Sequence, residues 1–241
     1  MEAAHAEALR QADRFKTTLV SSVSHELKTP LAAATARVTG LIEEGGGCDS
    51  ARVREELTAV SEDLDRLNDS IGDLLDLSRL ESDAWQPRFE EHDVRDILGT
   101  VLARLSALQR ERVQFDLAEN LPDVRVDFTQ LARALSNVVE NAFSYSASDS
   151  SVTVGARSSG AAVELWVADT GPGVPDAEKP RIFDKFYCGA ASASAPGGTG
   201  LGLAIAREIV RTHHGTLRVE DELPHGARFV LTIPIPAEET R

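Results

Sequence analysis

The amino-acid sequence predicts an all-α helical hairpin, which becomes a four-helix bundle on dimerisation, followed by an α+β sandwich. Residues 15–83 repeat apolar side chains at intervals of three and four, the pattern of bundled helices. The segment 84–88 contains Pro87 and interrupts that pattern. From about residue 93 onward, helical patterns alternate with short β-rich runs, which favours helices packed on a mainly antiparallel sheet.

The hairpin is indicated most clearly by its second helix. Its apolar positions follow spacings of 3, 4, 3, 4 and 3: Leu57, Val60, Leu64, Leu67, Ile71 and Leu74. A similar stripe runs from Val20 to Leu41, and the glycine-containing segment 44–50 joins the two, with Asp49 or Ser50 as the cap of the second helix. Two helices alone cannot bury so wide a stripe, so we expect a second copy to complete the bundle. A structural coiled-coil spacer is the alternative at this point.

The second part of the chain is expected to contain helices over 94–105, 127–143 and 201–212. Strands are expected over 113–117, 124–126, 152–154, 163–167, 216–220 and 227–233. Residues 171–200 are rich in glycine and proline and should form a long loop.

Charge and composition exclude several classes of function. The formal net charge is −14, which argues against binding to nucleic acid or to an anionic membrane surface. No apolar run is long enough to span a bilayer, and residues 1–10 lack the apolar core of a signal peptide. Two cysteines, Cys48 and Cys188, form no disulfide framework, so a reducing compartment is expected.

The segment SHELKTP at residues 24–30 places a histidine beside a carboxylate. Helical geometry turns His25 away from the apolar stripe and toward solvent, and Pro30 removes a backbone donor one turn later. An exposed imidazole whose proton Glu26 can hold or accept is a plausible nucleophile. Taken alone, such a pair is more often an ordinary solvated histidine.

Three further segments carry polar or glycine-rich patterns. Asn137, Glu140 and Asn141 share one helical face, where amide and carboxylate oxygens suit a hard cation such as Mg²⁺, although a plain polar surface is equally consistent. The run 169–173, DTGPG, follows a strand and could place a carboxylate and open backbone against a flat base, or be only a turn. The run 197–204, GGTGLGLA, opens a helix, where free N–H groups favour phosphate.

Together, SHELKTP, NVVENAFSYS, DTGPG, IFDKF and GGTGLGLAIAREIV, in this order, resemble the sensor histidine kinases of two-component systems over about residues 12–235. Within that family RLESDAWQP and IFDKF look most like the potassium-responsive, KdpD-type branch. The resemblance implies a dimerisation and phosphoacceptor domain over 15–83 and a catalytic ATP-binding domain of the gyrase, Hsp90 and MutL type over 93–236. Residues 1–14 would form an entering helix, 84–92 a linker and 237–241 a tail.

The resemblance also implies roles for individual residues. His25 would be the phosphorylated residue, Glu26 its acid/base partner and Thr29 the group that orients water during dephosphorylation of a response regulator. Asn137 and Asn141 would bind Mg²⁺. The nucleotide would be ATP, and its remaining contacts would come from Tyr145, Asp169, Gly171, Gly173, Lys185, Phe186, Gly198, Thr199, Gly200, Leu201 and Gly202.

The expected function is therefore that of a homodimeric, cytoplasmic protein-histidine kinase that passes its phosphoryl group to a receiver-domain aspartate and also dephosphorylates that partner. It would be a naturally soluble kinase or the cytoplasmic part of a membrane-bound receptor. Two positions depart from the family pattern, because Ser144 and Cys188 stand where many relatives carry a basic residue, and Lys185 or Arg181 could compensate. An ATP-driven clamp of the same nucleotide-binding superfamily and a non-enzymatic dimeric scaffold are the alternatives.

Overall fold

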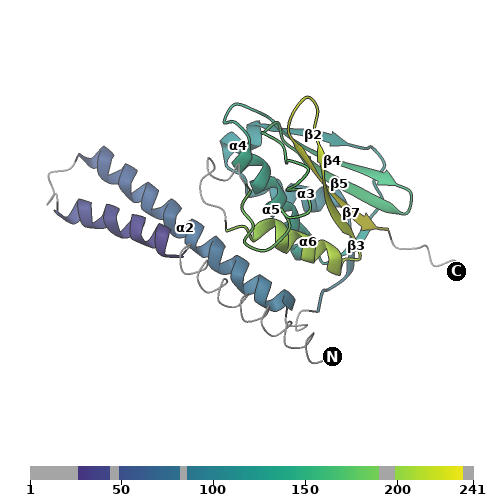
Figure 1. The fold of residues 1–241 in the computed structure, drawn as a ribbon, viewed down its shortest axis with the longest axis horizontal. Helices are drawn as coiled ribbons and strands as arrows, with labels where there is room; N and C mark the ends of the chain where they lie inside the picture. Colours follow the sequence, from purple (N-terminus) through teal and green to yellow (C-terminus); the bar gives the residue numbers. More distant parts are fainter. Residues whose placement is uncertain (1–26, 44–48, 82–85, 190–198, 236–241) are drawn as a thin grey trace. The chain divides into compact units, whose positions relative to one another are not determined.

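A computed structural model describes residues 27–43, 49–81, 86–189 and 199–235, which divide into two compact units, 1–75 and 76–241. In the first unit, residues 27–43 are helical and precede the long helix α2, Ser50–Glu81 (Figure 1). Asp49 rather than Ser50 caps α2, since its Oδ1 accepts from the Ala51 N–H at 3.4 Å. The predicted helix-loop-helix order is therefore confirmed for the described residues.

Ion pairs hold the described part of the hairpin in register. The Arg37 guanidinium lies 3.0 Å from Glu56 Oε2 and 3.5 Å from Asp63 Oδ2, so one side chain of the first helix reaches two turns of α2. Asp63 is buried, as is Ala34 on the facing helix. Partly buried pairs of this kind fix the alignment of two helices more than they add to stability.

The second unit is a two-layer α+β sandwich (Figure 1). Its five-stranded sheet has the order β2 (Val113–Leu117), β4 (Val152–Ser159), β5 (Ala162–Ala168), β7 (Ala227–Pro234) and β6 (Thr216–Asp221). The pairs β4–β5, β5–β7 and β7–β6 are antiparallel, whereas β2 and β4 are parallel. A separate two-stranded sheet pairs β1 (Glu90–His92) with β3 (Val124–Val126).

The helices of this unit are α3 (Val94–Ala103), α4 (Ala107–Glu111), α5 (Phe128–Tyr145) and α6 (Gly202–Thr212). Two of the observed elements, β1 and α4, were not predicted from the sequence. α4 is a single short turn stabilised by a capping box between Ser106 and Gln109, and β1 carries the charged sequence EEH, so neither has a long apolar pattern. The predicted β4 and β5 are each longer in the structure than expected.

The core lies between the sheet and the amphipathic faces of α3, α5 and α6. Residues of α5 and α6 that are fully buried or nearly so include Leu131, Leu135, Val138, Ile205 and Ile209. Each such aliphatic side chain contributes about 1.5–3 kcal/mol by leaving water. Opposite them lie alternate residues of β5: Val163, Leu165 and Val167.

The other face of the sheet carries a tryptophan packed on a glycine. A Cβ at Gly155 would lie 2.0 Å from the Trp166 ring, so only glycine allows this contact. The Arg157 and Arg228 guanidiniums lie 5.6 and 5.5 Å from the ring centre. Beside them, hydrogen bonds from Arg157 and then Arg218 hold the pKa of Glu164 below its usual value, against the effect of burial.

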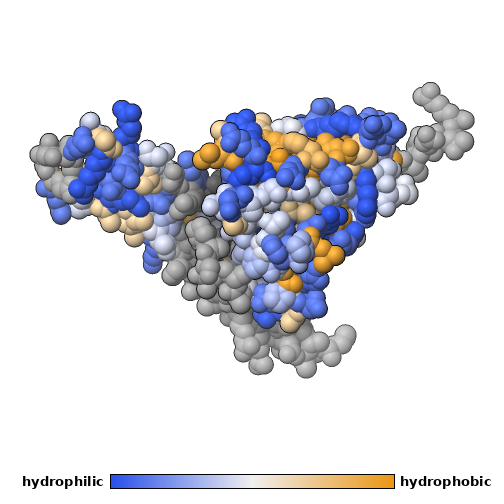
Figure 2. Space-filling view, turned by 90° about the horizontal axis from the view of Figure 1, so that it is seen from above, coloured by the Kyte–Doolittle hydropathy of each residue, from blue (hydrophilic) through white to orange (hydrophobic). Residues whose placement is uncertain are grey.

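Seen from above, apolar side chains gather in a band over the second unit, bordered by hydrophilic ones (Figure 2). Among the described residues of the second unit, the most exposed large apolar side chains are Leu108, Phe115 and Leu223. Within the described residues, every helix is too short or too polar to cross a bilayer.

Candidate active site

One face of α5 carries three of the predicted side chains. Asn137, Asn141 and Tyr145 follow one another at four-residue intervals and are all half-buried. Asp127 caps the start of this helix, because its Oδ1 accepts from the Gln130 N–H at 3.1 Å. With a rise of 1.5 Å per residue, Asn137 and Tyr145 lie roughly 12 Å apart along the axis. The face is therefore long enough to contact two distant parts of one elongated ligand.

The Asn137 end of α5 adjoins the start of α6. Asn137 Nδ2 donates to the Gly202 carbonyl at 3.0 Å, which leaves Oδ1 as the atom of this amide available to a cation. Before α6, Leu201 is fully buried and its N–H donates to Thr199 Oγ1 at 3.1 Å. The first N–H groups of a helix lack intrahelical acceptors, so the start of α6 is suited to an anion.

The Tyr145 end of α5 adjoins the turn that follows β5. A Cβ at Gly171 would lie 2.6 Å from the Tyr145 carbonyl oxygen and 2.9 Å from Asp169 Oδ1, so a larger residue would push the turn away. At Gly173, where φ is +74°, a Cβ would lie 3.0 Å from the Gly226 carbonyl oxygen. We expected these glycines to let the backbone approach a flat base. In the structure, their lack of a side chain allows close contact with the backbone of Tyr145 and Gly226.

Asp169 is the most buried carboxylate of the site, with 2% of its surface exposed. Its Oδ1 accepts from the Gly171 N–H at 2.8 Å and from the Ala227 N–H at 3.4 Å. Burial raises the pKa of Asp169, the two backbone donors oppose that rise, and the negative charge of Glu222 adds to it. Both donors reach Oδ1, so Oδ2 is the oxygen that a ligand donor would meet.

The IFDKF segment, 182–186, contacts the glycine-rich segment that precedes α6. The Phe186 N–H donates to the Gly200 carbonyl at 2.9 Å, and a Cβ at Gly200 would lie 2.8 Å from the Phe186 carbonyl carbon. Lys185 is half-buried and lies close enough to Glu208 to affect it. The pKa of Glu208 is lowered first by its hydrogen bond from Arg211, against burial, and further by the charge of Lys185.

Not every predicted residue falls within the described chain. His25, Glu26 and Gly198 lie outside the described residues. Thr29 is helical and exposed, and the helix continues through Pro30.

His213, which was not among the predicted residues, joins the end of α6 to the start of α5. It is 3% exposed, its Nδ1 donates to the Ile209 carbonyl at 2.8 Å, and its Nε2 accepts from the Asp127 N–H at 2.9 Å. Burial lowers the pKa of His213, as expected for a ring that must stay neutral to accept that bond. A histidine directly after an amphipathic helix and before His214 and Gly215 was the available signal.

Comparison with known proteins matches both parts of the chain. Residues 15–83 match the His Kinase A (phospho-acceptor) domain, and residues 126–237 match the Histidine kinase-, DNA gyrase B-, and HSP90-like ATPase family. The chain is 35% identical over 219 residues to the sensor-like histidine kinase SenX3 of Mycobacterium tuberculosis, covering 89% of this chain and 53% of SenX3. It is also 35% identical to the histidine-protein kinase/phosphatase MprB of Mycolicibacterium vanbaalenii, covering 91% of this chain and 46% of MprB.

Solved structures of histidine kinases also match this chain. A mycobacterial sensor histidine kinase MprB chain is 32% identical, with a TM-score of 0.50, and the match covers 60% of this chain and 97% of that one. ShkA in complex with AMPPNP is 26% identical, with a TM-score of 0.64 over 90% of this chain and 45% of ShkA. The chain belongs to the histidine kinase family. It spans about half the length of the curated relatives that it matches.

The two positions that depart from the family pattern both lie at the surface of this chain. Ser144 is exposed, and its hydroxyl donates to the Glu140 carbonyl at 2.8 Å. Cys188 is also exposed. Of the two basic residues that could compensate, Arg181 stacks over the Tyr187 ring at 4.6 Å, and Lys185 lies near Glu208.

The residues present in this chain fit Mg²⁺ only together with oxygens from a bound ligand. Among the described residues, no group of three His, Cys, Asp or Glu side chains converges as a metal site. The amide oxygens of Asn137 and Asn141 are hard donors, and Asn137 Nδ2 is already engaged by Gly202. Two neutral oxygens bind a divalent cation weakly, so anionic oxygens of a bound nucleotide would complete its shell.

Proposed function

We propose that this chain is the kinase core of a two-component signalling protein. ATP phosphorylates His25, and the phosphoryl group then passes to an aspartate in the receiver domain of a response regulator. The observation that carries the proposal is the polar face of α5, which contacts Gly202 at one end and the Gly171 turn at the other. In the same chain, the residues that precede this site, 15–83, match the phosphoacceptor family.

The nucleotide is expected to lie along α5 with its base at the Tyr145 end. Asp169 Oδ2 accepts from the exocyclic amine of adenine, and the Tyr145 ring packs against the base. Gly171 and Gly173 keep the turn close to that carboxylate. A carboxylate that is 2% exposed recovers part of its desolvation cost when it gains a donor, which favours an amine-bearing base.

The phosphates are expected at the other end, over the segment Gly198 to Gly202. The segment Thr199 to Leu201 lies directly ahead of α6, where helix N–H groups favour an anion, and Lys185 and Phe186 border the same segment through the Phe186–Gly200 hydrogen bond. Asn137 and Asn141 would hold Mg²⁺, which supplies charge neutralisation for the phosphates. This order places base and phosphates at opposite ends of the same helix face.

The phosphoacceptor chemistry is proposed for the first helix. A ring nitrogen of His25 attacks the γ-phosphorus of ATP in line, the bond to the bridging oxygen breaks, and ADP leaves with that oxygen. Glu26 holds or accepts the proton on the other ring nitrogen. Thr29, one helical turn from His25 and exposed, orients the water that hydrolyses the aspartyl phosphate of the partner.

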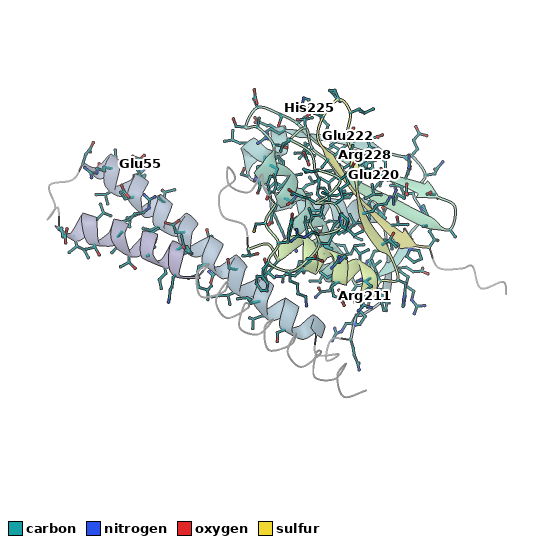
Figure 3. The ribbon with its side chains drawn as sticks, viewed as in Figure 1. Glu55, Arg211, Glu220, Glu222, His225 and Arg228 are labelled. Carbon is teal, nitrogen blue, oxygen red and sulfur yellow. The ribbon has the colours of Figure 1, made fainter. Side chains whose placement is uncertain are left out.

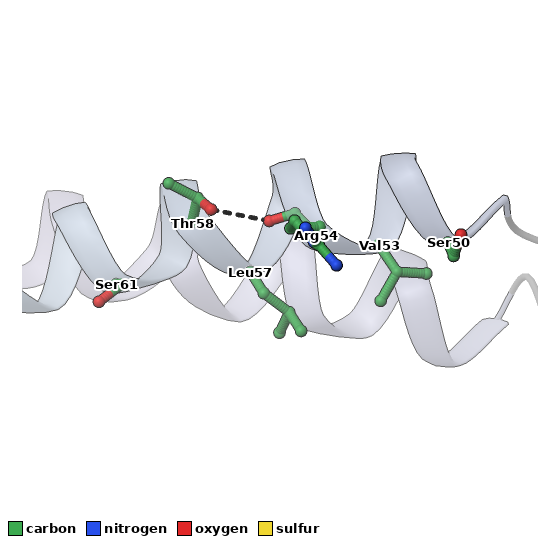
Figure 4. Close-up of a pocket in the computed structure, with 6 residues that line it drawn as sticks. All are labelled: Ser50, Val53, Arg54, Leu57, Thr58 and Ser61. Atoms are coloured by element: carbon green, nitrogen blue, oxygen red, sulfur yellow. Dashed lines mark hydrogen bonds between the residues drawn. The ribbon is translucent and has the colours of Figure 1, made fainter.

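A homodimer through residues 15–83 is proposed from the unburied half of the apolar seam. Val60, Leu67 and Leu74 are half-buried within one copy. The alternate positions stay exposed at seven-residue spacing: Leu57 by 52%, Leu64 by 45% and Ile71 by 40%. The open hollow in Figure 4 lies along the same helix and is lined by α2 residues alone, including Val53 and Leu57. A second hairpin would cover this stripe, with about 1.5–3 kcal/mol for each large side chain buried.

The proposed domain limits are 15–83 for dimerisation and phosphoacceptance, 84–92 for the linker and 93–236 for catalysis, with 1–14 as the entering helix and 237–241 as a tail. We propose that the kinase works in the cytoplasm, where ATP and a response regulator are available. The reducing environment suits two cysteines that form no disulfide framework.

Incubation with γ-labelled ATP and Mg²⁺ tests this function. The expected result is label that is lost in acid and kept in alkali, as for phosphohistidine, and absent from His25→Gln. His25→Gln should still bind ATP, because the nucleotide contacts lie in the other unit. Nucleotide binding without label would favour a scaffold, whereas rapid ATP hydrolysis without label would favour an ATP-driven clamp.

A further inference from the structure

The turn between β6 and β7, residues 222–226, is a braced element next to the nucleotide carboxylate. The Glu222 N–H donates to the Gly226 carbonyl at 3.1 Å, which closes the turn. At its base the Arg228 guanidinium donates to both carboxylate oxygens of Glu222, at 2.7 and 3.3 Å. Figure 3 places Glu222, His225 and Arg228 together at this end of the two strands. Two hydrogen bonds from one guanidinium to one carboxylate fix the position of Glu222 relative to Arg228 and so hold the turn in one geometry.

Gly226 packs directly on the backbone of Asp169. A Cβ at Gly226 would lie 1.9 Å from the Asp169 carbonyl oxygen and 3.0 Å from Thr170 Cα, and its φ of +130° is one that other residues rarely adopt. Next to this contact, Asp169 and Ala227 exchange two hydrogen bonds. The Asp169 N–H donates to the Ala227 carbonyl at 2.9 Å, and the Ala227 N–H donates to Asp169 Oδ1 at 3.4 Å.

His225 holds the next residue of the same loop. Its Nδ1 donates to the Thr170 carbonyl at 3.1 Å from an exposed position at the tip of the turn. Gly226 also accepts the close approach of Gly173. The backbone from Asp169 to Gly173 is therefore held from one side by Tyr145 of α5 and from the other side by the β6–β7 turn.

We propose that the β6–β7 turn is a positioning element for nucleotide recognition, in which Gly226 and His225 fix the Asp169 carboxylate at the place where it meets the base. This inference rests on the proposed function, in which Asp169 reads the exocyclic amine. The turn acts through its contacts with the backbone of Asp169, Thr170 and Gly173, so Gly226 and His225 are positioning residues. Their effect should appear as loss of discrimination between bases rather than as a general loss of binding.

The test compares binding of ATP with binding of inosine triphosphate, which carries a carbonyl in place of the amine. Wild type should prefer ATP by at least about tenfold, the value of one charge-assisted hydrogen bond, and Asp169→Asn should lose most of that preference. Gly226→Ala should reduce the preference by a similar factor. His225→Ala should reduce it by roughly two- to tenfold, and His225→Gln, which keeps an N–H donor, should restore part of it.

Two controls separate positioning from folding. Gly160 also lies in a hairpin turn with positive φ, at +63°, but nothing lies within 4 Å of its Cβ position, so Gly160→Ala should keep the preference. Circular dichroism and thermal unfolding report whether Gly226→Ala folds. If Gly226→Ala does not fold, His225→Ala tests the inference instead, because His225 is exposed. A general packing defect would weaken both nucleotides equally and would overturn the inference.

The test distinguishes a failure of this inference from a failure of the proposed function. A wild-type protein without any preference for ATP overturns the role of Asp169 in the proposed function and this inference with it. A wild-type preference that Asp169→Asn abolishes, but that His225→Ala and Gly226→Ala leave unchanged, overturns the inference and leaves the proposed function standing.

Discussion

Replacing Asp169 by Asn should make the unliganded protein more stable and its nucleotide binding weaker. Asp169 is 2% exposed, and burial raises its pKa, so its ionised form carries an unrecovered desolvation cost at neutral pH. An amide has the same shape, and its oxygen can still accept from the Gly171 and Ala227 N–H groups. We expect a gain of about 1 kcal/mol in the free energy of unfolding, or roughly 2–4 °C in the midpoint of the nucleotide-binding unit.

The raised pKa of Asp169 determines how this difference in stability should change with pH. The unfolded carboxyl titrates at about pH 3.9, and burial moves the folded pKa of Asp169 to a higher value. Between those two values the folded state binds more protons, so wild-type stability falls as pH rises through this window. The advantage of Asp169→Asn should open as pH rises across the same window and close below about pH 4.

Bound nucleotide should make wild type more stable than Asp169→Asn, the reverse of the order expected without ligand. Loss of the charge-assisted hydrogen bond to the base weakens ATP by roughly 10- to 150-fold. ATP at 100 times the wild-type dissociation constant adds about 2.7 kcal/mol to wild type and far less to the variant. Thermal unfolding with and without ATP-Mg²⁺, at pH 7 and near pH 4, measures both effects. A variant that is less stable than wild type at neutral pH, or one that binds ATP equally well, would refute the reasoning.

Three further predictions follow from single residues. Thr29→Ala should keep autophosphorylation and slow dephosphorylation of the response regulator, measured with labelled regulator; normal dephosphorylation would contradict the role given to Thr29. Ser144→Lys should tighten ATP roughly three- to tenfold, with less effect at high salt, because one cation is added near the phosphates; no tightening in titrations at two salt concentrations would mean that Lys185 or Arg181 already compensates. Urea unfolding should show stability falling as pH drops below about 6.5, since burial lowers the folded pKa of His213 and its cation cannot accept from Asp127. That acid loss should be smaller in His213→Gln, and an equal loss in both proteins would count against this explanation.

Long elements were predictable because their apolar periodicity is local. The spacing from Leu57 to Leu74 defined the second hairpin helix, and the stripes of α5 and α6 appeared at the expected positions. The candidate site residues Asn137, Asp169 and Gly202 could be proposed in the same way, since each lies in a short distinctive segment. Short elements without such a pattern were missed, as with α4 and β1.

Contacts between distant segments were not predictable from local pattern. The parallel pairing of β2 with β4 depends on which strands meet across the sheet, and a strand pattern alone carries no direction. The division of the hairpin seam into packed and exposed positions likewise depends on which face of α2 the first helix covers.

Periodicity and motif spacing were enough to predict a helical part and an α+β part, the helices of the candidate site and the polar residues on them, because both are properties of neighbouring residues. Tertiary structure decided which backbone those residues meet. Gly171 faces the Tyr145 carbonyl, Gly226 faces Asp169, and His213 joins α6 to the start of α5. The physical reason is that burial, and with it the pKa of Asp169 and of His213, is set by elements brought together only when the sheet and helices pack.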